Sequence, residues 1–516
     1  MVGSAATIVD LVRASCERWP DRPVLTIDGG PTLTRVELRG LVERAMGALD
    51  GRFAPGDRVV VSMENRVEYL VAFIAVVARR GVVVPLNPAS GPVDGRHILR
   101  ASRAVLAIVD EAGAKHVADR EELADLRAVI ELGGDEPDGL PAGPPVSLAD
   151  ARTEADDLVA VTFTSGTTGL PKGCMIDHRW LLRATDVALR IHEYTPDDRI
   201  FYPVKFFYMD APLALLRAFA CGGRFVATRA FSVSRFWDVV RRHEVTILST
   251  IASMPAWLLK APPRPDDRDH KVRFAIQAHI APELHAAMDE RWGFPWLENY
   301  GMTEAGLIAR VPVELADRLR ATGAAGPPAP GVEVRIVDEE LADVPAGRPG
   351  EILVRQPGMF RGYLDMPEAT AELLHDGWIR TGDVGTLDAD GILSVVGRIK
   401  EMIRRSGENI SAAEVETVLA AHPAILEAAA VAVPDADHGE EVKVYVQLVD
   451  GTAAADVEPA EIVAFCAARL ARHKVPRYLQ IVDDLPRTVT HRVRKQLLAD
   501  LAGEVVDTAP LRGGGG

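Results

Sequence analysis

The 516-residue chain has few cysteines and lysines and no long apolar run. An uncharged stretch of about 18 residues, which a membrane span needs, does not occur, so we expect no transmembrane helix. The N-terminus does not have the basic region and apolar core of a signal peptide. The scattered cysteines form neither a metal-ligand spacing nor a disulfide framework, which indicates free thiols and a cytoplasmic location. They are Cys16, Cys174, Cys221 and Cys466.

Basic residues are outnumbered by acidic ones, 58 to 74, so the formal net charge is −16 at pH 7. Nucleic-acid binders carry basic surfaces, so this balance speaks against a nucleic-acid partner. Hydrophobic content of 48% and charged content of 26% are ordinary for a globular enzyme. Only nine of the 58 basic residues are lysine, so a lysine within a phosphate-binding pattern is informative, whereas an arginine in a lysine position is also explained by composition.

Periodicity predicts an α/β protein with more than one domain, as the length requires. Strand-like and helix-like segments alternate over residues 55–110 and 199–300, a pattern typical of parallel sheets covered by helices. Short strands with Gly and Pro turns over residues 326–397 predict a β-rich subdomain. After Gly397 a small α/β pattern returns, with helices expected at 414–421 and 459–471 and strands at 428–433 and 442–449.

We therefore predict a large N-terminal domain with several subdomains, which binds ATP and substrate, over residues 1–397. A small mobile α/β domain would follow over residues 398–512. The four glycines at 513–516 would form a flexible tail.

The most informative segment is residues 164–173, Thr-Ser-Gly-Thr-Thr-Gly-Leu-Pro-Lys-Gly. It follows a buried-strand pattern at residues 158–163 and precedes a helical pattern at residues 180–192. In a strand–loop–helix context, glycines let the backbone approach an anion while N–H groups and hydroxyls point inward. Lys172 would add a mobile positive charge for the outer phosphates. The alternative is a flexible surface loop; a Walker A loop is excluded because Gly-Lys-Ser/Thr is absent.

Four further motifs follow in order, and with the loop they give a resemblance to the adenylate-forming superfamily of acyl-CoA synthetases, peptide-synthetase adenylation domains and luciferases. The resemblance spans nearly the whole chain, and the Lys172-Gly-Cys-Met stretch with the last motif is most similar to carnitine/crotonobetaine-type CoA ligases. The four motifs are Asn299-Tyr-Gly-Met-Thr-Glu304, Gly377-Trp-Ile-Arg-Thr-Gly-Asp383, Gly397-Arg-Ile-Lys400 and Ser406-Gly-Glu-Asn-Ile410.

The resemblance implies an ATP- and Mg²⁺-dependent ligase in which an acid attacks the α-phosphate of ATP and a thiol, usually of CoA, then displaces AMP. It implies catalytic roles for Lys172, Thr303, Glu304 and Arg492, with Glu304 as the Mg²⁺ ligand. The implied ATP- and AMP-binding residues are Thr164, Ser165, Gly166, Thr167, Thr168, Gly169, Lys172, Asn299, Tyr300, Thr303, Asp383 and Arg398.

Four of these residues also have a purely structural interpretation. Glu304 could be an N-terminal helix carboxylate, which the helix dipole favours. Asp383 could be a turn aspartate, and Tyr300, which would otherwise stack on adenine, could be a core aromatic. Arg398 could belong to a solvated charged face together with Lys400 and Arg404.

The sequence departs from the family near its C-terminus. The family has Gly-Lys there, and this lysine bridges carboxylate and α-phosphate; here His491 and Arg492 occupy these positions. Arginine keeps the charge but not the compact geometry of an ammonium. Lys495 lies three residues further on and would substitute only if the loop shifts. The resemblance also places the hinge of the small domain at Glu401.

The expected acyl pocket also departs from the family pattern. Lys205, Phe207, Tyr208, Asp210 and His279 are candidate substrate-binding residues, and several of them are unusual beside a fatty chain. Burying such polar groups without partners costs several kcal/mol. They favour a small polar or aromatic acid, unless Lys205 and Asp210 point to solvent.

Four functions remain open at this point. The first is an acid–CoA ligase, and the second is a diazotase of secondary metabolism that adenylates nitrite and transfers it to an aryl amine. The third is a stand-alone enzyme that loads a carrier protein, and the fourth is a nucleotide-binding sensor without turnover. We leave open a homodimer.

Overall fold

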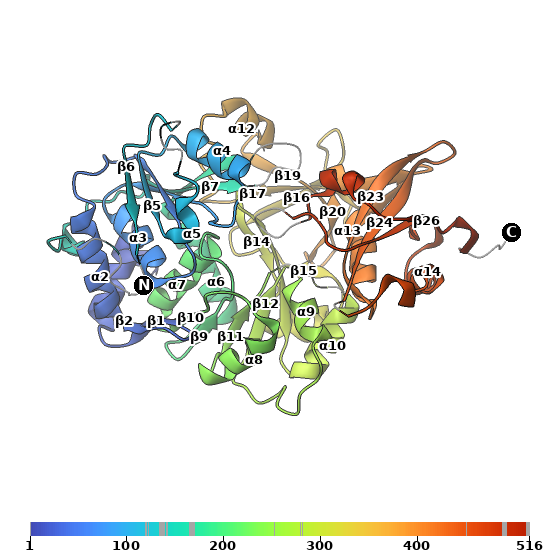
Figure 1. Cartoon of the computed structure of the whole chain (residues 1–516), viewed down its shortest axis with the longest axis horizontal. Helices are drawn as coiled ribbons and strands as arrows, with labels where there is room; N and C mark the ends of the chain where they lie inside the picture. The colour runs from blue at the N-terminus through green and yellow to red at the C-terminus, as the bar shows by residue number, and fades with distance from the viewer. Residues whose placement is uncertain are drawn as a thin grey trace.

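The computed structural model describes residues 2–118, 121, 123–133, 140, 143–164, 171–251, 253–278, 280, 282–449, 451–487 and 493–511. Four β-sheets carry the fold, and helices lie against them (Figure 1). The helices are α1 Ile8–Arg18, α2 Arg35–Ala48, α3 Val67–Ala78, α4 Pro92–Ser102, α5 Glu111–Ala114, α6 His178–His192, α7 Asp210–Cys221, α8 Val233–Arg242, α9 Met254–Lys260, α10 Pro282–Trp292, α11 Ala316–Leu319, α12 Pro367–Leu373, α13 Ala412–Ala420 and α14 Pro459–Ala467.

The largest sheet has eight strands in the order β14-β13-β12-β11-β9-β10-β1-β2. Its central strands run parallel, while the pairs β13–β14 and β1–β2 are antiparallel. The strands are β1 Pro23–Ile27, β2 Thr32–Thr34, β9 Arg199–Phe201, β10 Arg224–Ala227, β11 Ile247–Ser249, β12 Phe274–Gln277, β13 Trp296–Met302 and β14 Gly306–Arg310.

The second sheet has the order β6-β5-β3-β4-β7-β8 and is parallel except for the β7–β8 hairpin. Helix α3 is buried at every residue, because it belongs to one hydrophobic core shared with strands of both sheets. The strands are β3 Arg58–Ser62, β4 Val82–Pro85, β5 Leu106–Val109, β6 Ala128–Glu131, β7 Leu158–Thr164 and β8 Lys172–Asp177.

The third sheet is antiparallel and contains the β-rich segment expected from the sequence. Its path is β15-β20-β19-β17-β16, and β18 pairs with β19. The strands are β15 Ala324–Gly326, β16 Glu333–Val337, β17 Gly350–Arg355, β18 Leu374–His375, β19 Trp378–Leu387 and β20 Leu393–Arg398.

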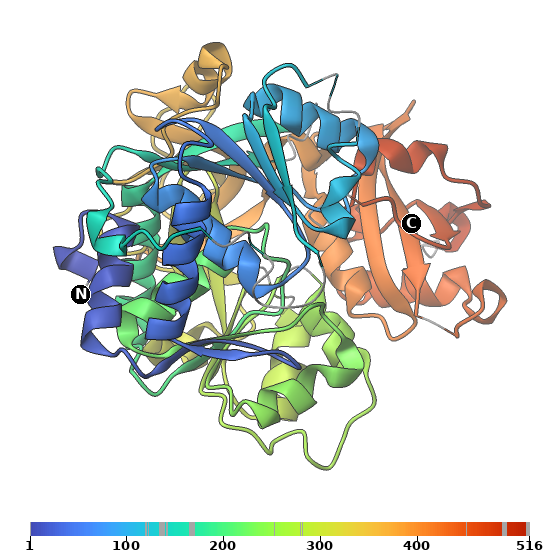
Figure 2. The ribbon, with the colours of Figure 1, turned by 60° about the vertical axis from the view of Figure 1, so that its left-hand side comes forward.

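The fourth sheet, with α13 and α14, forms the C-terminal end of the molecule (orange to red in Figures 1 and 2). The short helical turn Ile399–Glu401 joins β20 to this sheet. The strands are β21 Met402–Arg405, β22 Glu408–Ser411, β23 Ile425–Asp435, β24 Gly439–Leu448, β25 Tyr478–Val482 and β26 Val505–Asp507. The α/β fold, with a large N-terminal part and a smaller C-terminal α/β part, is thereby confirmed, while the domain boundary near 398 stays a prediction.

One sequence expectation about the phosphate loop is wrong. Lys172 begins strand β8, which pairs antiparallel with β7, so the loop joins a hairpin and does not lead directly into a helix. Helix α6 begins only after β8, where Asp177 accepts a hydrogen bond from the Trp180 N–H at 3.0 Å. Among the described residues, no helix is long and apolar enough to cross a membrane.

Candidate active site

The β7–β8 hairpin brings Thr164 directly opposite Lys172, at the two ends of the phosphate loop. The Thr164 hydroxyl lies 3.5 Å from the Lys172 carbonyl oxygen, to which it donates. Ser165, Gly166, Thr167, Thr168 and Gly169, the other predicted loop ligands, lie outside the described residues. The Lys172 ammonium therefore extends from a fixed strand at one end of this loop.

A segment nearly two hundred residues away completes this hairpin. The Arg361 N–H donates to the Met175 carbonyl, and the Leu364 N–H donates to the Gly173 carbonyl, each at 2.8 Å, so the segment lies along β8. Tyr363 consequently reaches the site, where its ring centroid lies 5.1 Å from the Lys172 Nζ.

Glu304 is buried beside this segment, with 7% of its surface exposed. The Tyr363 hydroxyl donates to Glu304 Oε1 at 2.8 Å, and the Cys174 thiol donates to the same oxygen at 3.6 Å. Burial, and then the Glu304 charge, raise the pKa of both donors above their usual ranges. Tyr363 and Cys174 thus stay protonated and orient the Glu304 carboxylate.

A second cluster surrounds Asp383, which pairs with Arg398 across the β19–β20 register. The Tyr300 hydroxyl donates to Asp383 Oδ2 at 2.6 Å, and Arg398 Nε lies 3.1 Å from Oδ1. Burial and the Asp383 charge raise the Tyr300 pKa, so its hydroxyl remains a donor. Residues of three sequence motifs therefore meet at one carboxylate.

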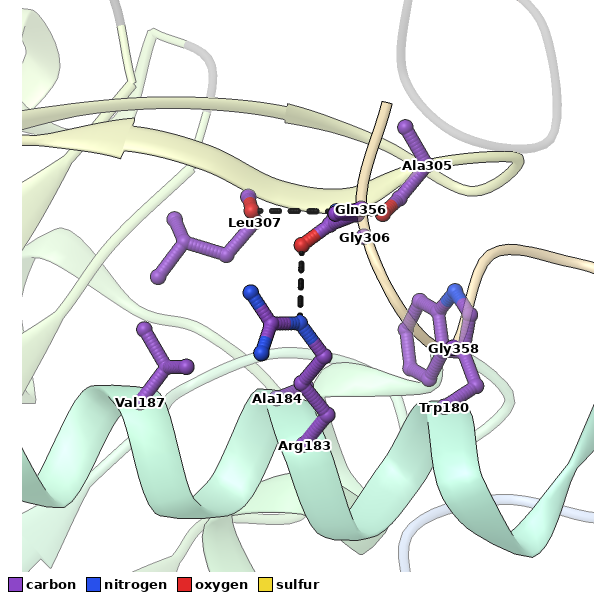
Figure 3. A pocket seen from close by; sticks show the side chains of 9 residues that line it. All are labelled: Trp180, Arg183, Ala184, Val187, Ala305, Gly306, Leu307, Gln356 and Gly358. Atoms are coloured by element: carbon purple, nitrogen blue, oxygen red, sulfur yellow. Dashed lines mark hydrogen bonds between the residues drawn. The ribbon is translucent and has the colours of Figure 1, made fainter. Parts of the chain in front are cut away.

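The two clusters are connected by the β13–β14 hairpin, whose turn includes Thr303 and Glu304. Helix α6 holds this turn in place, since the Trp180 indole N–H donates a hydrogen bond to the Thr303 carbonyl at 3.1 Å. Figure 3 shows the adjoining pocket, where Arg183 donates to Gln356 and Gln356 donates to the Leu307 carbonyl. These bonds fix the hairpin, so the Glu304 and Tyr300 side chains have a rigid base.

The described residues contain no group of three or more His, Cys, Asp and Glu that would cage a metal ion alone. Mg²⁺, however, is commonly bound through one or two carboxylates together with substrate phosphates and water. Glu304 fits that role, because Tyr363 and Cys174 both contact its Oε1 and the carboxylate is firmly oriented. A single oriented carboxylate next to Lys172 suits a metal–phosphate complex better than a free metal.

The predicted substrate segment lies after β9 and is held by Asn65. The Asn65 side chain donates to the Val204 carbonyl at 2.7 Å and accepts from the Phe206 N–H at 2.7 Å. Within this segment Lys205 forms an ion pair with Glu64. Lys205 therefore already has a protein partner.

The rest of this segment contributes two rings and a carboxylate. The Phe207 and Tyr208 ring centroids are 4.3 Å apart. Asp210 has an exposed surface, and desolvation by the surrounding protein raises the pKa of its carboxyl. His279 lies outside the described residues.

Of the two candidates for the C-terminal catalytic cation, the structure describes Lys495. Lys495 Nζ lies 2.7 Å from both Glu401 Oε2 and Glu416 Oε1, so the carboxylate of the predicted hinge is paired within the C-terminal part. These two carboxylates raise the Lys495 pKa, although burial opposes them. Arg492 lies outside the described residues.

Sequence reasoning missed Tyr363 and Trp180, which position Glu304 and Thr303. Tyr363 follows Gly362, whose φ of +107° lies in the left-handed region that favours glycine. That glycine is a local signal for a special backbone position, but nothing nearby in the sequence points to β8 or Glu304.

Comparison with known proteins agrees with this geometry. Residues 12–364 match the family of AMP-binding enzymes, and residues 414–492 match the AMP-binding enzyme C-terminal domain. The chain is 31% identical to an oxalate–CoA ligase of Arabidopsis thaliana over 96% of this chain and 98% of the relative. A sulfoacetate–CoA ligase of Cupriavidus necator shows 31% identity with the same coverage.

A crotonobetaine/carnitine–CoA ligase of Escherichia fergusonii is 32% identical over 86% of this chain and 88% of its own. Among solved structures, ATP-bound MatB from Rhodopseudomonas palustris superposes with a TM-score of 0.82 at 28% identity, covering 95% of this chain and 98% of that one. The chain therefore belongs to the AMP-binding enzyme family. It is an ATP-dependent, AMP-forming ligase, and the adenylate-forming resemblance is confirmed.

Proposed function

We propose that this enzyme adenylates a small carboxylic acid with ATP and transfers the acyl group to CoA. The observation that carries the proposal is the pair of clusters that the β13–β14 hairpin connects, with Lys172 and Tyr363 around Glu304 and with Tyr300 and Arg398 around Asp383. One end offers positive charge and a metal-binding oxygen for phosphates. The other offers a buried carboxylate for hydroxyl groups, so the site suits a nucleoside triphosphate.

At the nucleotide end, Asp383 accepts hydrogen bonds from the ribose hydroxyls and Tyr300 stacks on adenine. Lys172 and the phosphate-loop residues 164–169 bind the β- and γ-phosphates, and Thr303 contacts the α-phosphate. Glu304 holds Mg²⁺, which supplies charge neutralisation on the phosphate oxygens when bound. The chain's own contribution to the first step is to place the substrate carboxylate in line with the α-phosphate and to stabilise the developing charge.

The C-terminal part supplies the remaining charge in this proposal. In this structure Lys495 is held by Glu401 and Glu416, which supports Arg492 as the residue that bridges carboxylate and α-phosphate. The small domain then turns about Glu401 and admits the thiol of CoA. The relatives named above are CoA ligases, which supports CoA as the acceptor.

The names of the relatives favour a small acid. Oxalate and sulfoacetate each carry a second anionic group, whereas the relatives named feruloyl-CoA synthase indicate an aromatic acid. None of these relatives is named for nitrite or an amine acceptor, so they give no support to the diazotase alternative.

Pyrophosphate release is the assay that tests the proposal. The purified chain is incubated with ATP and Mg²⁺ and a panel of small carboxylic acids, with and without CoA, and separately with nitrite plus aromatic amines. We expect acid-dependent release and formation of an acyl-CoA. Release that depends on nitrite and amine, with no response to any acid, would contradict the proposal.

A further inference from the structure

Two arginines beside the predicted substrate segment are buried, and several of their nitrogens have no hydrogen-bond partner among the described residues. Arg217 lies on α7 and is 9% exposed, and Arg310 ends β14 and is 5% exposed. Arg217 Nε and the Arg310 atoms Nε and Nη1 have no hydrogen-bond partner among the described residues. A buried guanidinium in this state has lost its hydration without replacement, which is costly.

Arg35 shows how this chain satisfies an arginine that serves only structure. Its side chain is fully buried, and it donates to Ser15 Oγ and to the carbonyls of four residues. These carbonyls belong to Arg22, Pro23, Ala218 and Gly223. By contrast, no described residue accepts a hydrogen bond from Arg217 Nε or from Arg310 Nε and Nη1, which is the state expected of groups that bind a ligand.

The surroundings of the two arginines contain little negative charge. Asp210 is close enough to both for electrostatic interaction but forms an ion pair with neither. Burial, followed by Asp210, raises the pKa of Tyr202, and burial raises that of Tyr194 despite both arginines, so both phenols stay neutral. One carboxylate therefore faces two guanidinium groups.

The pKa shifts describe an uncompensated positive site. Burial, and then the charge of Arg217, lower the pKa of Arg310 to about 10, so it is still protonated at neutral pH. Burial, and then the charges of Arg310, Arg217 and Arg273, lower the pKa of His192 to about 2, which leaves its ring uncharged. An anion would relieve the repulsion between the guanidinium groups.

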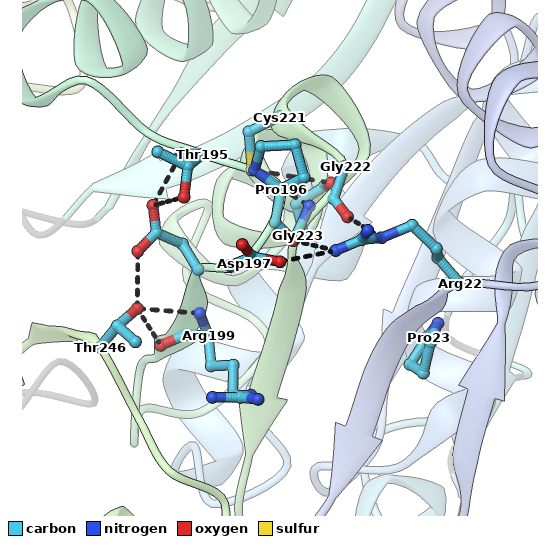
Figure 4. Close-up of polar contacts among 12 residues, drawn as sticks. Arg22, Pro23, Thr195, Pro196, Asp197, Arg199, Cys221, Gly222, Gly223 and Thr246 are labelled. Carbon is cyan, nitrogen blue, oxygen red and sulfur yellow. Dashed lines mark hydrogen bonds and ion pairs between the residues drawn. The ribbon is translucent and has the colours of Figure 1, made fainter. Parts of the chain in front are cut away.

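The segments around these arginines are held firmly in place. The loop between α6 and β9 contains Tyr194. It is fixed because Asp198 accepts hydrogen bonds from the Thr195 N–H and from the Thr246 hydroxyl, each at 2.7 Å. Arg22 donates to the Gly222 carbonyl at 3.2 Å, where α7 ends (Figure 4). Within this frame the Tyr194 hydroxyl and Arg217 Nε are buried and have no hydrogen-bond partner among the described residues.

The pair lies next to the proposed adenylation site. Arg310 is directly opposite Asn299 in the β13–β14 register. Asn299 in turn precedes Glu304 by five residues. Arg217 is two helical turns beyond Asp210 on α7, and residues at this spacing share one face of a helix. Asp210 is exposed and both arginines are buried, and Asp210 interacts electrostatically with both of them.

We infer that Arg217 and Arg310 bind a second anionic group of the acid substrate, so that the enzyme acts on small acids with a carboxylate or sulfonate at the far end. This inference rests on the proposed function. The carboxylate to be adenylated would face Thr303, and the other anion would lie between the two guanidinium groups. Two arginines suit a planar or tetrahedral oxyanion because each presents several N–H donors in a fixed geometry.

Matched pairs of acids test the inference. Pyrophosphate release is measured with malonate, succinate and sulfoacetate, and with neutral-ended counterparts: monomethyl malonate, monomethyl succinate and methylsulfonylacetate. We expect kcat/KM to favour the anion-ended member of a pair by about 10- to 100-fold, the range for one or two charged hydrogen bonds. A wild-type preference for the neutral members would overturn the inference.

Variants then assign the preference to the two arginines. Arg217→Met and Arg310→Met should each lower kcat/KM for the anion-ended acids about 10- to 100-fold and leave the neutral-ended acids within about threefold. Arg310→Lys should keep part of the preference because it keeps the charge. Equal losses for both members of a pair would overturn the inference.

Stability separates this role from a structural one. Removing an unpartnered buried charge should leave Tm unchanged or higher, whereas removing a structural arginine would lower Tm. Arg58→Met is the control, since the Arg58 Nε already donates to the Ser102 carbonyl at 2.8 Å, and it should not alter the acid preference. A large fall of Tm in Arg310→Met would contradict the site.

Failure of the proposed function can be told apart from failure of the anion site. If no acid supports pyrophosphate release, the function is wrong, and calorimetric binding of malonate, succinate and sulfoacetate decides on the anion site alone. Binding that Arg310→Met abolishes would support the site, and no binding of any of the three would overturn it.

Discussion

Tyr363→Phe should weaken Mg²⁺-dependent adenylation without changing the fold. The substitution removes one hydroxyl, which donates to Glu304 Oε1 at 2.8 Å. A hydrogen bond to a charged acceptor contributes about 1.5–3 kcal/mol. Changes to groups that orient metal ligands cost about 10- to 100-fold in metal affinity or activity. The Cys174 thiol remains in contact with the same oxygen, so we expect the lower end, about 10-fold.

The assay is pyrophosphate release at saturating acid and ATP over a range of Mg²⁺ concentrations. The variant should need about 10-fold more Mg²⁺ for half-maximal rate, with a smaller change in the rate at saturation. This pattern reports on orientation of the Glu304 carboxylate, since Tyr363 itself does not contact the reacting atoms in our proposal.

Tyr69→Phe is the matched control. Tyr69 is fully buried, and its hydroxyl has no hydrogen-bond partner among the described residues, so its removal breaks no bond. The control should keep the wild-type Mg²⁺ dependence. Unchanged Mg²⁺ dependence in Tyr363→Phe, or an equal shift in both variants, would refute the reasoning.

Further variants test the ribose site, the hinge, the role of Asp210 and the pH dependence of stability. Asp383→Asn should lower kcat/KM for ATP about 10- to 100-fold, because the charged acceptor of the ribose site is lost; an unchanged KM for ATP would exclude that role. Glu401→Pro should slow acyl transfer to CoA more than pyrophosphate release, while Glu401→Gln should spare both; equal slowing by proline would contradict the hinge. Asp210→Asn should raise kcat/KM for anion-ended acids about threefold or more, because a repelling charge is removed, and a fall would count against the anion site. Burial raises the pKa of Asp289 from 3.8 to about 6, so its stabilising contribution is present below 3.8 and is lost as the pH rises through 6. Asp289→Asn should therefore raise Tm at pH 7 but not at pH 4, and an equal change in Tm at both pH values would contradict this assignment.

Local pattern was sufficient for the elements whose sequence periodicity is strong. The valine-rich strand β3 and the all-apolar helix α3 follow from period and composition, because a helix between two sheets must be apolar on every face. The antiparallel sheet after Gly326 follows from short strands between Gly and Pro turns. The motifs around Lys172, Glu304 and Asp383 were sufficient for the class of enzyme.

Local pattern failed where pairing across the chain decided the structure. The segment at residues 172–177 is strand β8 and not a lead into a helix, because it pairs with β7 and with the distant segment around Tyr363. Strand pairing depends on long-range contacts, which periodicity in a single segment does not report.

The sequence by itself determined the nucleotide chemistry, since loop, carboxylates and arginine occur in short ordered motifs with their own chemical meaning. Only the tertiary structure decided which groups serve those motifs: Tyr363 on Glu304, Tyr300 on Asp383, and Arg217 with Arg310 beyond Asp210. The physical reason is that burial and the absence of a partner are properties of packing. A sequence shows that an arginine is present, and only the fold shows that it is buried with nitrogens that have no hydrogen-bond partner among the described residues.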